Sequence, residues 1–482
     1  MNLRDLVQVL PDIIEIKGNT SVDINCIAYD SRKVSSGCIF VAIKGYSKDG
    51  HDYINQAVSK GAKAVIGENK IELKNTPYIR VANSRKALAY SSNWFYEYPS
   101  RKLKIVGITG TNGKTTTAYL VKSLLEGAGF STGIIGTIGN IIKDQHIPAV
   151  RTTPESLELN QLFVKMIEHQ VDYAVMEVSS HSLKLHRVDG IGYEVGVFTN
   201  LTQDHLDFHG SFEDYFAAKK RLFEASKKAV VNVDDTYGRK LRELLTIPTI
   251  TYGINNDSDI KARNIDMNAD GVSYDIIVDG ELFHILYKVP GEFSIYNSLA
   301  ALAVGFSLGL PMKLLAESLK NVKGVSGRFE PIKMGQNFSV IIDYAHTPDG
   351  IENVLKAIKS FCKGRIITVF GCGGDRDKKK RPIMGGIASR LSDYCIITSD
   401  NPRSEEPDII MKEIEQGISE KNNYEKITDR REAIKRALEI AKKDDVILIA
   451  GKGHETYQII KDQVIKFDDG EVVKQLLKDR GF

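Results

Sequence analysis

The fold is decided by the loop Gly110-Thr111-Asn112-Gly113-Lys114-Thr115-Thr116. An apolar run from Leu103 to Ile108 precedes the loop and predicts a buried strand, and a stretch with helical periodicity follows it. A glycine loop between a strand and a helix presents backbone N–H groups and a helix N-terminus to a phosphate group. We therefore predict a nucleotide site in which Lys114 reaches the outer phosphates and Thr115 holds Mg²⁺.

This loop fits the general P-loop pattern only in part. That pattern would place a glycine at position 108, where this chain has Ile108, so the shorter form Gly-Thr-Asn-Gly-Lys-Thr is the closer match. The alternative is a glycine-rich turn that binds no ligand. A lysine and two threonines after the second glycine serve no purpose in such a turn, so we favour the phosphate site.

The bulk composition is that of an ordinary globular protein, with 42% hydrophobic and 26% charged residues. A length of 482 residues predicts about three domains, and a net charge of +3 is too small to favour nucleic acid. The N-terminus carries acids among its apolar residues, and the apolar stretch 298–312 is too short to span a bilayer. Five scattered cysteines without a Cys-x-x-Cys pair suit reduced thiols better than a disulfide framework or a zinc site. We expect a cytoplasmic protein without a membrane or nucleic-acid partner.

Apolar runs alternate with helical patterns from residue 103 to about 328, which predicts an α/β fold with a doubly wound, mostly parallel sheet. In such sheets ligands bind beyond the carboxyl ends of the strands. Glu177 follows one predicted strand, and His205 follows another, beside Asp204 and Asp207. Glu177 and His205 could thus converge on Mg²⁺ near the phosphates, although a hydrogen-bonded structural histidine is the alternative for His205.

The segment 211–226 predicts a helix with one apolar stripe, and Lys219 lies on that stripe. A lysine that faces inward must extend its ammonium to solvent, form an ion pair or change its charge. The sequence alone leaves these three alternatives open.

A second α/β sheet is predicted after residue 328, from apolar runs at 339–342, 366–370, 394–398 and 446–450. Arg, Asp and Glu side chains follow these strands. Gly371 and Gly373 resemble a dinucleotide fingerprint, but Arg376 stands where the third glycine would be, so NAD binding is disfavoured. A mixture of arginines and carboxylates instead suits a small ligand with ammonium and carboxylate groups.

Five motifs occur in order: Gly110-Thr-Asn-Gly-Lys-Thr-Thr116, Glu177-Val-Ser-Ser-His181, Thr199-Asn-Leu-x-x-Asp-His205, Asp343-Tyr-Ala-His-Thr-Pro-Asp349 and Gly451-Lys-Gly-His-Glu455. In these motifs the chain resembles the Mur ligases, over essentially its whole length. The resemblance implies three domains: a UDP-substrate-binding domain (1–98), a central P-loop-type ATP-binding domain (99–328) and a C-terminal Rossmann-like amino-acid-binding domain (329–482).

Within this family the chain looks like the members that add the third residue of the peptidoglycan stem peptide. The resemblance implies that ATP phosphorylates the D-glutamate γ-carboxylate of UDP-MurNAc-L-Ala-D-Glu, after which an amino acid attacks the acyl phosphate. It also implies two Mg²⁺ ions, held by Thr115, Glu177, His205 and Lys219, with Lys219 N-carboxylated to a carbamate. A carbamate would turn the inward-facing cation into an anion beside metal.

The resemblance assigns further residues to the two nucleotides and to the peptide. For ATP these are the loop residues 110–116, with Asn297 at the adenine, Arg328 at a phosphate and Asp343 at the ribose. The uridine end is assigned Ser31, Tyr46, Ser47 and Lys48, although the residues alone favour ordinary surface turns there. The muramoyl-peptide portion is assigned Thr152, Thr153, Ser179 and Arg187. Leu185 departs from the family pattern, which often has glutamine two residues before this arginine.

The segment Asp400-Asn401-Pro402-Arg403 resembles the form found in members that add meso-diaminopimelate, where arginine binds the distal carboxylate. Lysine lacks that carboxylate, so Arg403 would discriminate against it. Arg376, Gly451 and Glu455 would complete the pocket. The alternatives are a lysine-adding member, a folylpolyglutamate-type synthetase, a kinase, or a module in which ATP moves domains without making a bond. We expect a monomer.

Overall fold

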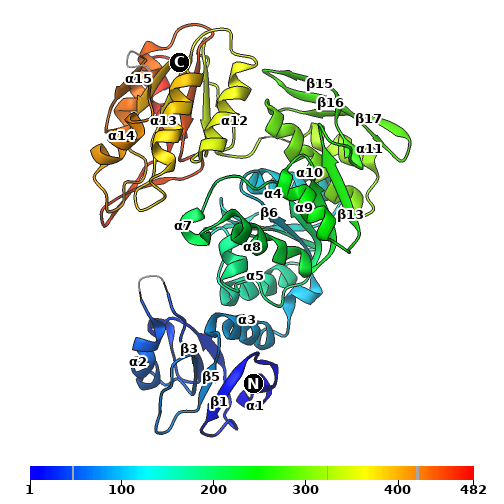
Figure 1. The fold of residues 1–482 in the computed structure, drawn as a ribbon, viewed down its shortest axis with the longest axis vertical. Helices are drawn as coiled ribbons and strands as arrows, with labels where there is room; N and C mark the ends of the chain where they lie inside the picture. The colour runs from blue at the N-terminus through cyan, green and yellow to red at the C-terminus, as the bar shows by residue number, and fades with distance from the viewer. Residues whose placement is uncertain (46–47, 323, 420–422) are drawn as a thin grey trace. The chain divides into compact units, whose positions relative to one another are not determined.

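The computed structural model of the protein describes residues 1–45, 48–322, 324–419 and 423–482 (Figure 1). Tyr46 and Ser47, which we assigned to the uridine end, lie outside the described residues. The chain divides into two compact units. The first unit comprises Met1–Thr109, Gly129–Gly196 and Ala217–Ala229, and the second comprises Gly110–Ala128, Val197–Phe216 and Val230–Phe482.

The N-terminal part of the first unit contains a five-stranded sheet in the order β1-β5-β4-β3-β2. Strands β3 and β4 are buried along their whole length because they lie inside the sheet. The strands are β1 (Ile13–Lys17), β2 (Cys26–Ala28), β3 (Cys38–Val41), β4 (Ala64–Gly67) and β5 (Tyr78–Val81), and the helices are α1 (Leu3–Val9), α2 (Ile54–Ser59) and α3 (Ser84–Phe95).

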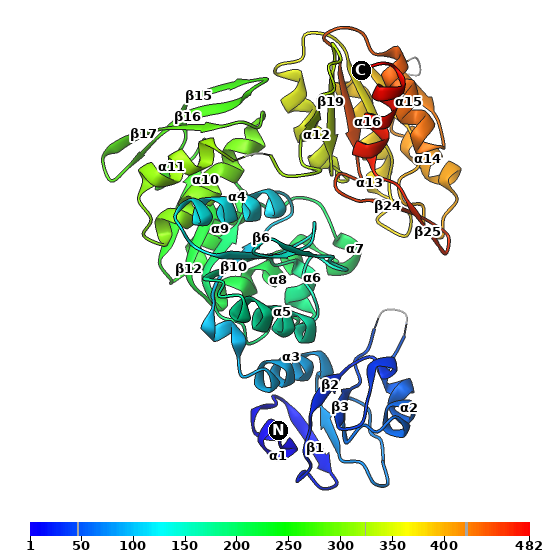
Figure 2. The ribbon, with the colours of Figure 1, turned by 180° about the vertical axis from the view of Figure 1, so that it is seen from behind.

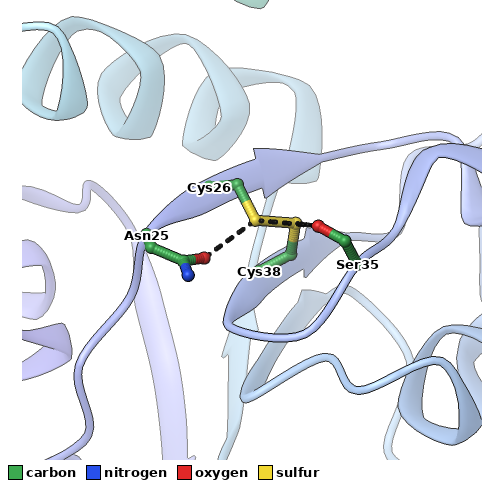
Figure 3. Close-up of a disulfide and its surroundings, with 4 residues drawn as sticks. All are labelled: Asn25, Cys26, Ser35 and Cys38. Carbon is green, nitrogen blue, oxygen red and sulfur yellow. Dashed lines mark hydrogen bonds between the residues drawn. A yellow bond between two sulfur atoms is a disulfide. The ribbon is translucent and has the colours of Figure 1, made fainter.

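One prediction about this sheet is wrong. Cys26 and Cys38 form a disulfide with an S–S distance of 2.05 Å, whereas we expected reduced thiols (Figure 3). The two cysteines are 12 residues apart in sequence, but the parallel pairing of β2 with β3 places them opposite each other, with Cα atoms 4.3 Å apart. A search for close cysteine spacing misses a pair that strand register brings together. The other three cysteines are free thiols.

The central strands form a nine-stranded sheet in the order β14-β13-β12-β11-β6-β10-β7-β8-β9. Strand β10 pairs in parallel with β6 and with β7, as predicted, while β8 and β9 add an antiparallel edge. The strands are β6 (Lys104–Thr109), β7 (Thr132–Ile135), β8 (Asn140–Ile142), β9 (Gln145–Ile147), β10 (Tyr173–Glu177), β11 (Tyr193–Phe198), β12 (Ser226–Asn232), β13 (Thr249–Gly253) and β14 (Ile260–Lys261).

The helices between these strands follow the predicted alternation. They are α4 (Lys114–Gly127), α5 (Ser156–Glu168), α6 (Ser180–Lys184), α7 (Leu206–His209), α8 (Phe212–Glu224), α9 (Thr236–Leu244), α10 (Glu292–Ser307) and α11 (Met312–Lys320). Helix α10 packs against α4, which brings residues far apart in sequence to the phosphate loop (Figure 2). A separate antiparallel sheet of β15 (Arg263–Asn268), β16 (Gly271–Val278) and β17 (Glu281–Tyr287) was not foreseen.

The C-terminal part of the second unit has a six-stranded sheet in the order β18-β19-β23-β20-β21-β22. All its pairings are parallel except that of β18 with β19, which confirms the predicted second α/β sheet. The strands are β18 (Glu330–Ile332), β19 (Ser339–Asp343), β20 (Ile366–Phe370), β21 (Tyr394–Ile397), β22 (Tyr424–Lys426) and β23 (Val446–Ala450), and a hairpin of β24 (Tyr457–Ile460) and β25 (Gln463–Lys466) follows.

The helices of this part are α12 (Pro348–Lys359), α13 (Lys380–Leu391), α14 (Pro407–Glu415), α15 (Arg430–Ile440) and α16 (Asp469–Asp479). Helices α15 and α16 lie side by side and share one buried core with strands β19, β20 and β23 (Figure 2). Among the described residues, every helix is too short or too polar to cross a membrane.

Candidate active site

The phosphate loop lies in the second unit and depends on glycine at two positions. Gly110 and Gly113 have φ values of 154° and 83°, a region that side chains rarely adopt. A Cβ on Gly110 would collide with the Thr199 hydroxyl, and one on Gly113 would lie 2.5 Å from the Asn297 Oδ1. A side chain at either position would therefore collide with its neighbours, so the loop requires glycine there.

The end of β11 holds the loop in place. The N–H of Thr111 donates to the Asn200 carbonyl at 2.9 Å, and the N–H of Asn112 donates to the Asn200 Oδ1 at 2.9 Å. The Thr199 hydroxyl donates to the Asn112 carbonyl at 2.7 Å. Asn200 belongs to one of the sequence motifs, but only the tertiary structure shows that it supports the loop.

Lys114 and Thr115 begin helix α4, whose N-cap, Gly113, offers no side-chain cap. The Lys114 Nζ donates to the carbonyls of Gly110 and Thr111 at 2.9 and 2.8 Å. Thr115 is buried, and its hydroxyl accepts from the Arg328 guanidinium at 3.1 Å. The predicted phosphate contact and the predicted Mg²⁺ ligand are thus neighbours at a helix N-terminus, which favours anions.

Asn297 and Asp343 also belong to this region. Asn297 lies on α10 and accepts from the Thr117 hydroxyl at 3.4 Å. Asp343 ends β19 and accepts from the N–H groups of Phe329 and Ala345, both at 2.7 Å. Burial raises the pKa of the Asp343 carboxyl, while nearby Arg328 acts in the opposite direction. The expected adenine and ribose contacts of these two residues stay predictions.

His205 begins the short helix α7 with φ 53°, and its Nε2 lies 3.4 Å from the Asp204 Oδ2. Burial opposes ionisation of Asp204, but His205, His346 and Lys380 together hold the pKa of its carboxyl below the ordinary value. Burial and nearby Lys380 lower the pKa of His346 to about 4. The half-exposed His205 ring therefore has a carboxylate partner. Its role as a ligand of Mg²⁺ stays a prediction.

Glu177 and Lys219 lie in the first unit and are both 1% exposed. Glu177 ends β10, where its two oxygens accept from the N–H and the hydroxyl of Thr137 at 2.8 and 3.0 Å. Lys219 is buried as the apolar stripe of α8 predicted, whereas the next side chain, Lys220, is 40% exposed. Thr137 was missed by the sequence reasoning because no motif contains it.

The residues assigned to the muramoyl-peptide portion converge around Glu177. Thr153 donates to the Glu177 carbonyl at 2.8 Å and accepts from the N–H of Ser179 at 3.1 Å. Arg187 donates to the Thr153 carbonyl at 3.2 Å, and the Thr152 hydroxyl lies 3.1 Å from that of Thr137. Thr153 is more than twenty residues before Glu177 and Ser179, but the end of strand β10 brings them together.

The uridine end is described for Ser31 and Lys48 only. Ser31 is buried and its hydroxyl donates to the Gln56 side chain at 2.7 Å, which differs from the surface turn that the residues alone favoured. Lys48 is exposed.

The predicted amino-acid pocket lies in the second unit, beyond β21 and β23. Asn401 donates to Glu455 at 2.7 Å, and Arg403, with φ 53°, donates to the Gly374 carbonyl at 2.8 Å. Gly451 has φ 114°, and a Cβ there would lie 2.5 Å from the Asp400 Oδ2. Pro402, between Asn401 and Arg403, is buried.

Charges in this pocket act on one another. Burial lowers the pKa of Arg403, and the neighbouring Arg376 guanidinium lowers it further. Burial and Asp400 raise the pKa of the Glu455 carboxyl. Lys452, which we had not assigned, is fully buried, and its Nζ lies 3.3 Å from the Glu455 Oε2. Two adjacent guanidinium groups suit a carboxylate ligand, and Glu455 suits an ammonium.

Comparison with known proteins agrees with this arrangement. Residues 23–97 match the model described as "Mur ligase family, catalytic domain", residues 108–305 the "Mur ligase middle domain", and residues 327–453 the "Mur ligase, glutamate ligase domain". These matches cover each of the three regions in which we found site residues.

The chain is 50% identical over 468 residues to UDP-N-acetylmuramoyl-L-alanyl-D-glutamate--2,6-diaminopimelate ligase 1 of Clostridium acetobutylicum. The match covers 96% of this chain and 97% of the relative. It is 49% identical over 485 residues to the ligase of the same description from Clostridium botulinum, covering 99% and 100%.

A solved structure of a UDP-N-acetylmuramoyl-L-alanyl-D-glutamate--2,6-diaminopimelate ligase has 32% sequence identity and a TM-score of 0.71, and the match covers 100% of this chain and 99% of that one. The MurF ligase from Thermotoga maritima in complex with ADP has the same fold, with a TM-score of 0.65, 21% identity, and coverage of 95% and 99%. From its motifs, its fold and its full-length relatives, this chain belongs to the Mur ligase family.

Proposed function

We propose that this chain is an ATP-dependent ligase that joins meso-2,6-diaminopimelate to the D-glutamate γ-carboxylate of UDP-MurNAc-L-Ala-D-Glu. The observation that carries the proposal is the group of side chains beyond β21 and β23, where Arg403 and Arg376 both lie next to Gly373 and Asn401 donates to Glu455. The names of the relatives, which are about half identical over their whole length, support the same activity. The reaction belongs to the cytoplasmic synthesis of a peptidoglycan precursor.

A carboxylate reacts poorly with an amine because it is a weak electrophile and oxide is an impossible leaving group. Transfer of the ATP γ-phosphoryl group to the γ-carboxylate forms an acyl phosphate and ADP. The amine then forms the C–N bond as the C–O bond to phosphate breaks, and it loses a proton. Phosphoryl transfer needs alignment and neutralised charge, which Lys114, Arg328 and the N-terminus of α4 supply.

Two Mg²⁺ ions are proposed to bind Thr115, Glu177, His205 and the carbamate form of Lys219. When bound, they neutralise charge on the transferring phosphoryl group. The donor chemistry fits, because hydroxyl and carboxylate oxygens are ligands that Mg²⁺ prefers. A carbamate at Lys219 also fits its burial: once the ammonium has lost a proton, the amine nitrogen bonds CO₂ and releases a second proton, and the resulting anion is one that a metal can neutralise.

Discrimination between amino acids is assigned to the C-terminal pocket. Arg403, with Arg376 beside it, would bind the distal carboxylate, and Glu455 would accept from the distal ammonium. L-Lysine would leave a partly buried guanidinium without its anion and oppose it with an ammonium. Asp400, Pro402 and Gly451 shape the backbone of this pocket.

The other substrate is assigned to the first unit. We propose that Ser31 and Lys48, together with Tyr46 and Ser47, contact the uridine end, and that Thr152, Thr153, Ser179 and Arg187 contact the muramoyl-peptide portion. The proximity of Arg187 to Thr153 and Ser179 supports this assignment. We propose that the enzyme acts as a monomer and has no membrane or nucleic-acid partner.

A phosphate-release assay with purified protein, ATP and UDP-MurNAc-L-Ala-D-Glu tests the proposal. We expect release only when both the UDP-dipeptide and an amino acid are present, with kcat/KM for L-lysine lower than for meso-diaminopimelate by roughly 100-fold or more. Equal use of lysine would indicate a lysine-adding member. Phosphate release without either acceptor would indicate a nucleotide-driven module instead.

A further inference from the structure

One carboxylate in the first unit, that of Glu155, faces three guanidinium groups. Its Oε1 lies 3.0 Å from the Arg187 Nε, 3.4 Å from Arg85 and 3.5 Å from Arg151. The Glu155 side chain is only 5% exposed, and those of Arg187 and Arg85 are 9% and 15% exposed. None of these contacts was foreseen from the sequence; Arg85 and Arg187 lie in segments far from Glu155, whereas Arg151 is four residues before it.

Glu155 has a position that would ordinarily give it a different task. It is the N-cap residue of α5, where a carboxylate often accepts from the first N–H groups of its own helix. Its side chain makes no such cap bond and is turned toward the guanidinium groups instead. The helix thus forgoes the stabilisation of a side-chain cap, which indicates that the arginine contacts matter more here.

Each of two arginines connects Glu155 to a different part of the proposed UDP-substrate site. Arg187 donates to the Thr153 carbonyl at 3.2 Å, at the muramoyl-peptide end. Arg85, on α3, donates to the Lys44 carbonyl at 3.1 Å, and Lys44 is two residues before the segment 46–48 assigned to the uridine end. Glu155 therefore lies between the two ends of one binding site.

A second contact ties the same helix to the uridine end. The Tyr29 hydroxyl donates to the Glu158 Oε1 at 2.8 Å, and Tyr29 is two residues before the buried Ser31. Burial and the neighbouring Glu158 raise the pKa of the Tyr29 hydroxyl, so it stays a donor at neutral pH. Glu158, in the first turn of α5, thus contacts the flank of Ser31, and Glu155, the N-cap of α5, is linked through Arg85 to the flank of the segment 46–48.

We infer that Glu155 is a positioning residue for the UDP-MurNAc-dipeptide, an inference that rests on the proposed function. The carboxylate fixes Arg187 and Arg85 together, so that the muramoyl-peptide end and the uridine end are held at one spacing. It offsets one of three positive charges and leaves the cluster cationic, as suits a substrate with a diphosphate and carboxylates. Without this charge, the guanidinium groups repel one another and lose their common acceptor.

The first experiment measures KM and kcat for each substrate in wild type, Glu155→Gln and Glu155→Asp. We expect Glu155→Gln to raise KM for UDP-MurNAc-L-Ala-D-Glu about tenfold, with KM for ATP and for diaminopimelate within about twofold of wild type. Glu155→Asp keeps the charge and should recover part of the loss. Calorimetric titration with UDP-MurNAc-L-Ala-D-Glu alone should show the same loss of affinity.

A matched control is Asp445→Asn in the second unit. Asp445 is also a buried carboxylate, 3% exposed, and it pairs with Arg365 at 2.7 Å. This variant should lose stability to a similar extent but leave the KM for the UDP-dipeptide unchanged. Arg85→Gln, which keeps the Glu155 charge, gives a second variant if Glu155→Gln does not fold, and it should also raise this KM.

A double-mutant cycle with Arg187→Ala tests whether Glu155 acts through that arginine. We expect Glu155→Gln to raise KM by clearly less than tenfold in the Arg187→Ala background, because one of the two groups it positions is already absent while Arg85 remains. Unchanged KM in Glu155→Gln and Arg85→Gln, with an active wild type, would overturn the inference and leave the proposed function intact. An inactive wild type that also fails to bind the UDP-dipeptide would instead refute the proposed function.

Discussion

At the scale of single residues, the chain buries charged groups where its proposed chemistry needs them. Lys219, Glu177 and Lys452 are each at most 1% exposed. A buried charge is costly unless a partner, a metal ion or a change of protonation offsets it. Such residues are therefore the first positions at which function can be tested by substitution.

The carbamate at Lys219 leads to the first prediction. With ¹³C-bicarbonate, wild type should show a carbamate carbon signal by NMR that Lys219→Ala lacks, because only a lysine amine can take up CO₂ here. The kcat of Lys219→Ala should fall by roughly 100-fold or more. Lys220→Ala is the control, because Lys220 is 40% exposed and pairs with Glu224 at the surface. A wild-type spectrum without a carbamate signal would contradict the assignment.

Arg403 leads to the second prediction. Replacing Arg403 with alanine should lower kcat/KM for meso-diaminopimelate by roughly 100-fold while KM for ATP stays unchanged, because only the distal carboxylate loses its partner. Steady-state phosphate release measures both constants. Arg390→Ala is the control, since Arg390 is on the surface of the same part of the chain and 64% exposed. Unchanged kinetics in Arg403→Ala would rule out this contact.

At the scale of elements, loops at strand ends are fixed by partners from other elements. The loop after β20 is held by Glu405, which accepts from the N–H of Asp375 at 2.7 Å and from Arg381 of α13 at 2.8 Å. This loop carries Arg376, which we assign to the amino-acid pocket. The contacts that stabilise the loop after β20 therefore also fix the position of Arg376 in the proposed site.

Glu405 leads to a prediction about pH. The Arg381 guanidinium lowers the pKa of Glu405 from 4.5 to about 2. Because the folded pKa is lowered, the stabilisation is complete above pH 4.5 and is lost as pH falls toward about 2. Glu405→Gln should cost about 1 kcal/mol of unfolding free energy at pH 7, after allowance for solvent screening, and less at pH 3.

Urea unfolding at both pH values measures this difference. The neighbouring Glu406→Gln is the control, because Glu406 is 60% exposed and its ion pair with Lys461 lies at the surface. A loss of stability in Glu405→Gln that is equal at pH 7 and pH 3 would show that the charge of Glu405 is not responsible.

The disulfide between β2 and β3 leads to a fourth prediction. It closes a loop between residues 26 and 38 that contains Ser31. Reduction should destabilise this part of the first unit by about 3 kcal/mol, since a cross-link restricts the unfolded chain. Thermal unfolding with and without reductant measures the effect. The double variant Cys26→Ser/Cys38→Ser should have the unfolding midpoint of reduced wild type, with or without reductant. A wild-type midpoint that reductant does not change would contradict this prediction.

At the scale of the whole molecule, we propose domain boundaries at 98/99 and 328/329. The C-terminal sheet has a buried core made from residues 332–477, which supports the second boundary. The core residues of the N-terminal sheet come almost entirely from residues 3–88, with Leu157 as an addition from α5. Separate cores of this kind are typical of domains.

The second boundary leads to the last prediction. A fragment of residues 329–482 should fold alone and unfold cooperatively in urea, because residues 332–477 form a buried core of their own. Circular dichroism measures the transition. A fragment of residues 345–482, without β18 and β19, should not fold, because it lacks two strands of the sheet. A non-cooperative transition in the longer fragment would place the boundary elsewhere.

Four features could be predicted from local sequence patterns: the strand and helix alternation, the phosphate loop, the buried face of α8 and the second α/β sheet. These features are local, since each depends on periodicity or on residue types within a short segment. Lys219 was predicted to face inward for this reason, and it does. Asn401 and Glu455 were likewise predicted to belong to one site from their motifs, and their side chains are in contact at 2.7 Å.

The contacts between side chains that are distant in sequence could not be predicted in this way, and they follow from the tertiary structure. Cys26 and Cys38 pair because β2 and β3 are in register, and Glu155 contacts Arg85 and Arg187 from two distant segments. Asn200 supports the phosphate loop from the end of another strand. Contacts of this kind depend on sheet order and register, which bring together residues whose separation in sequence carries no local signal.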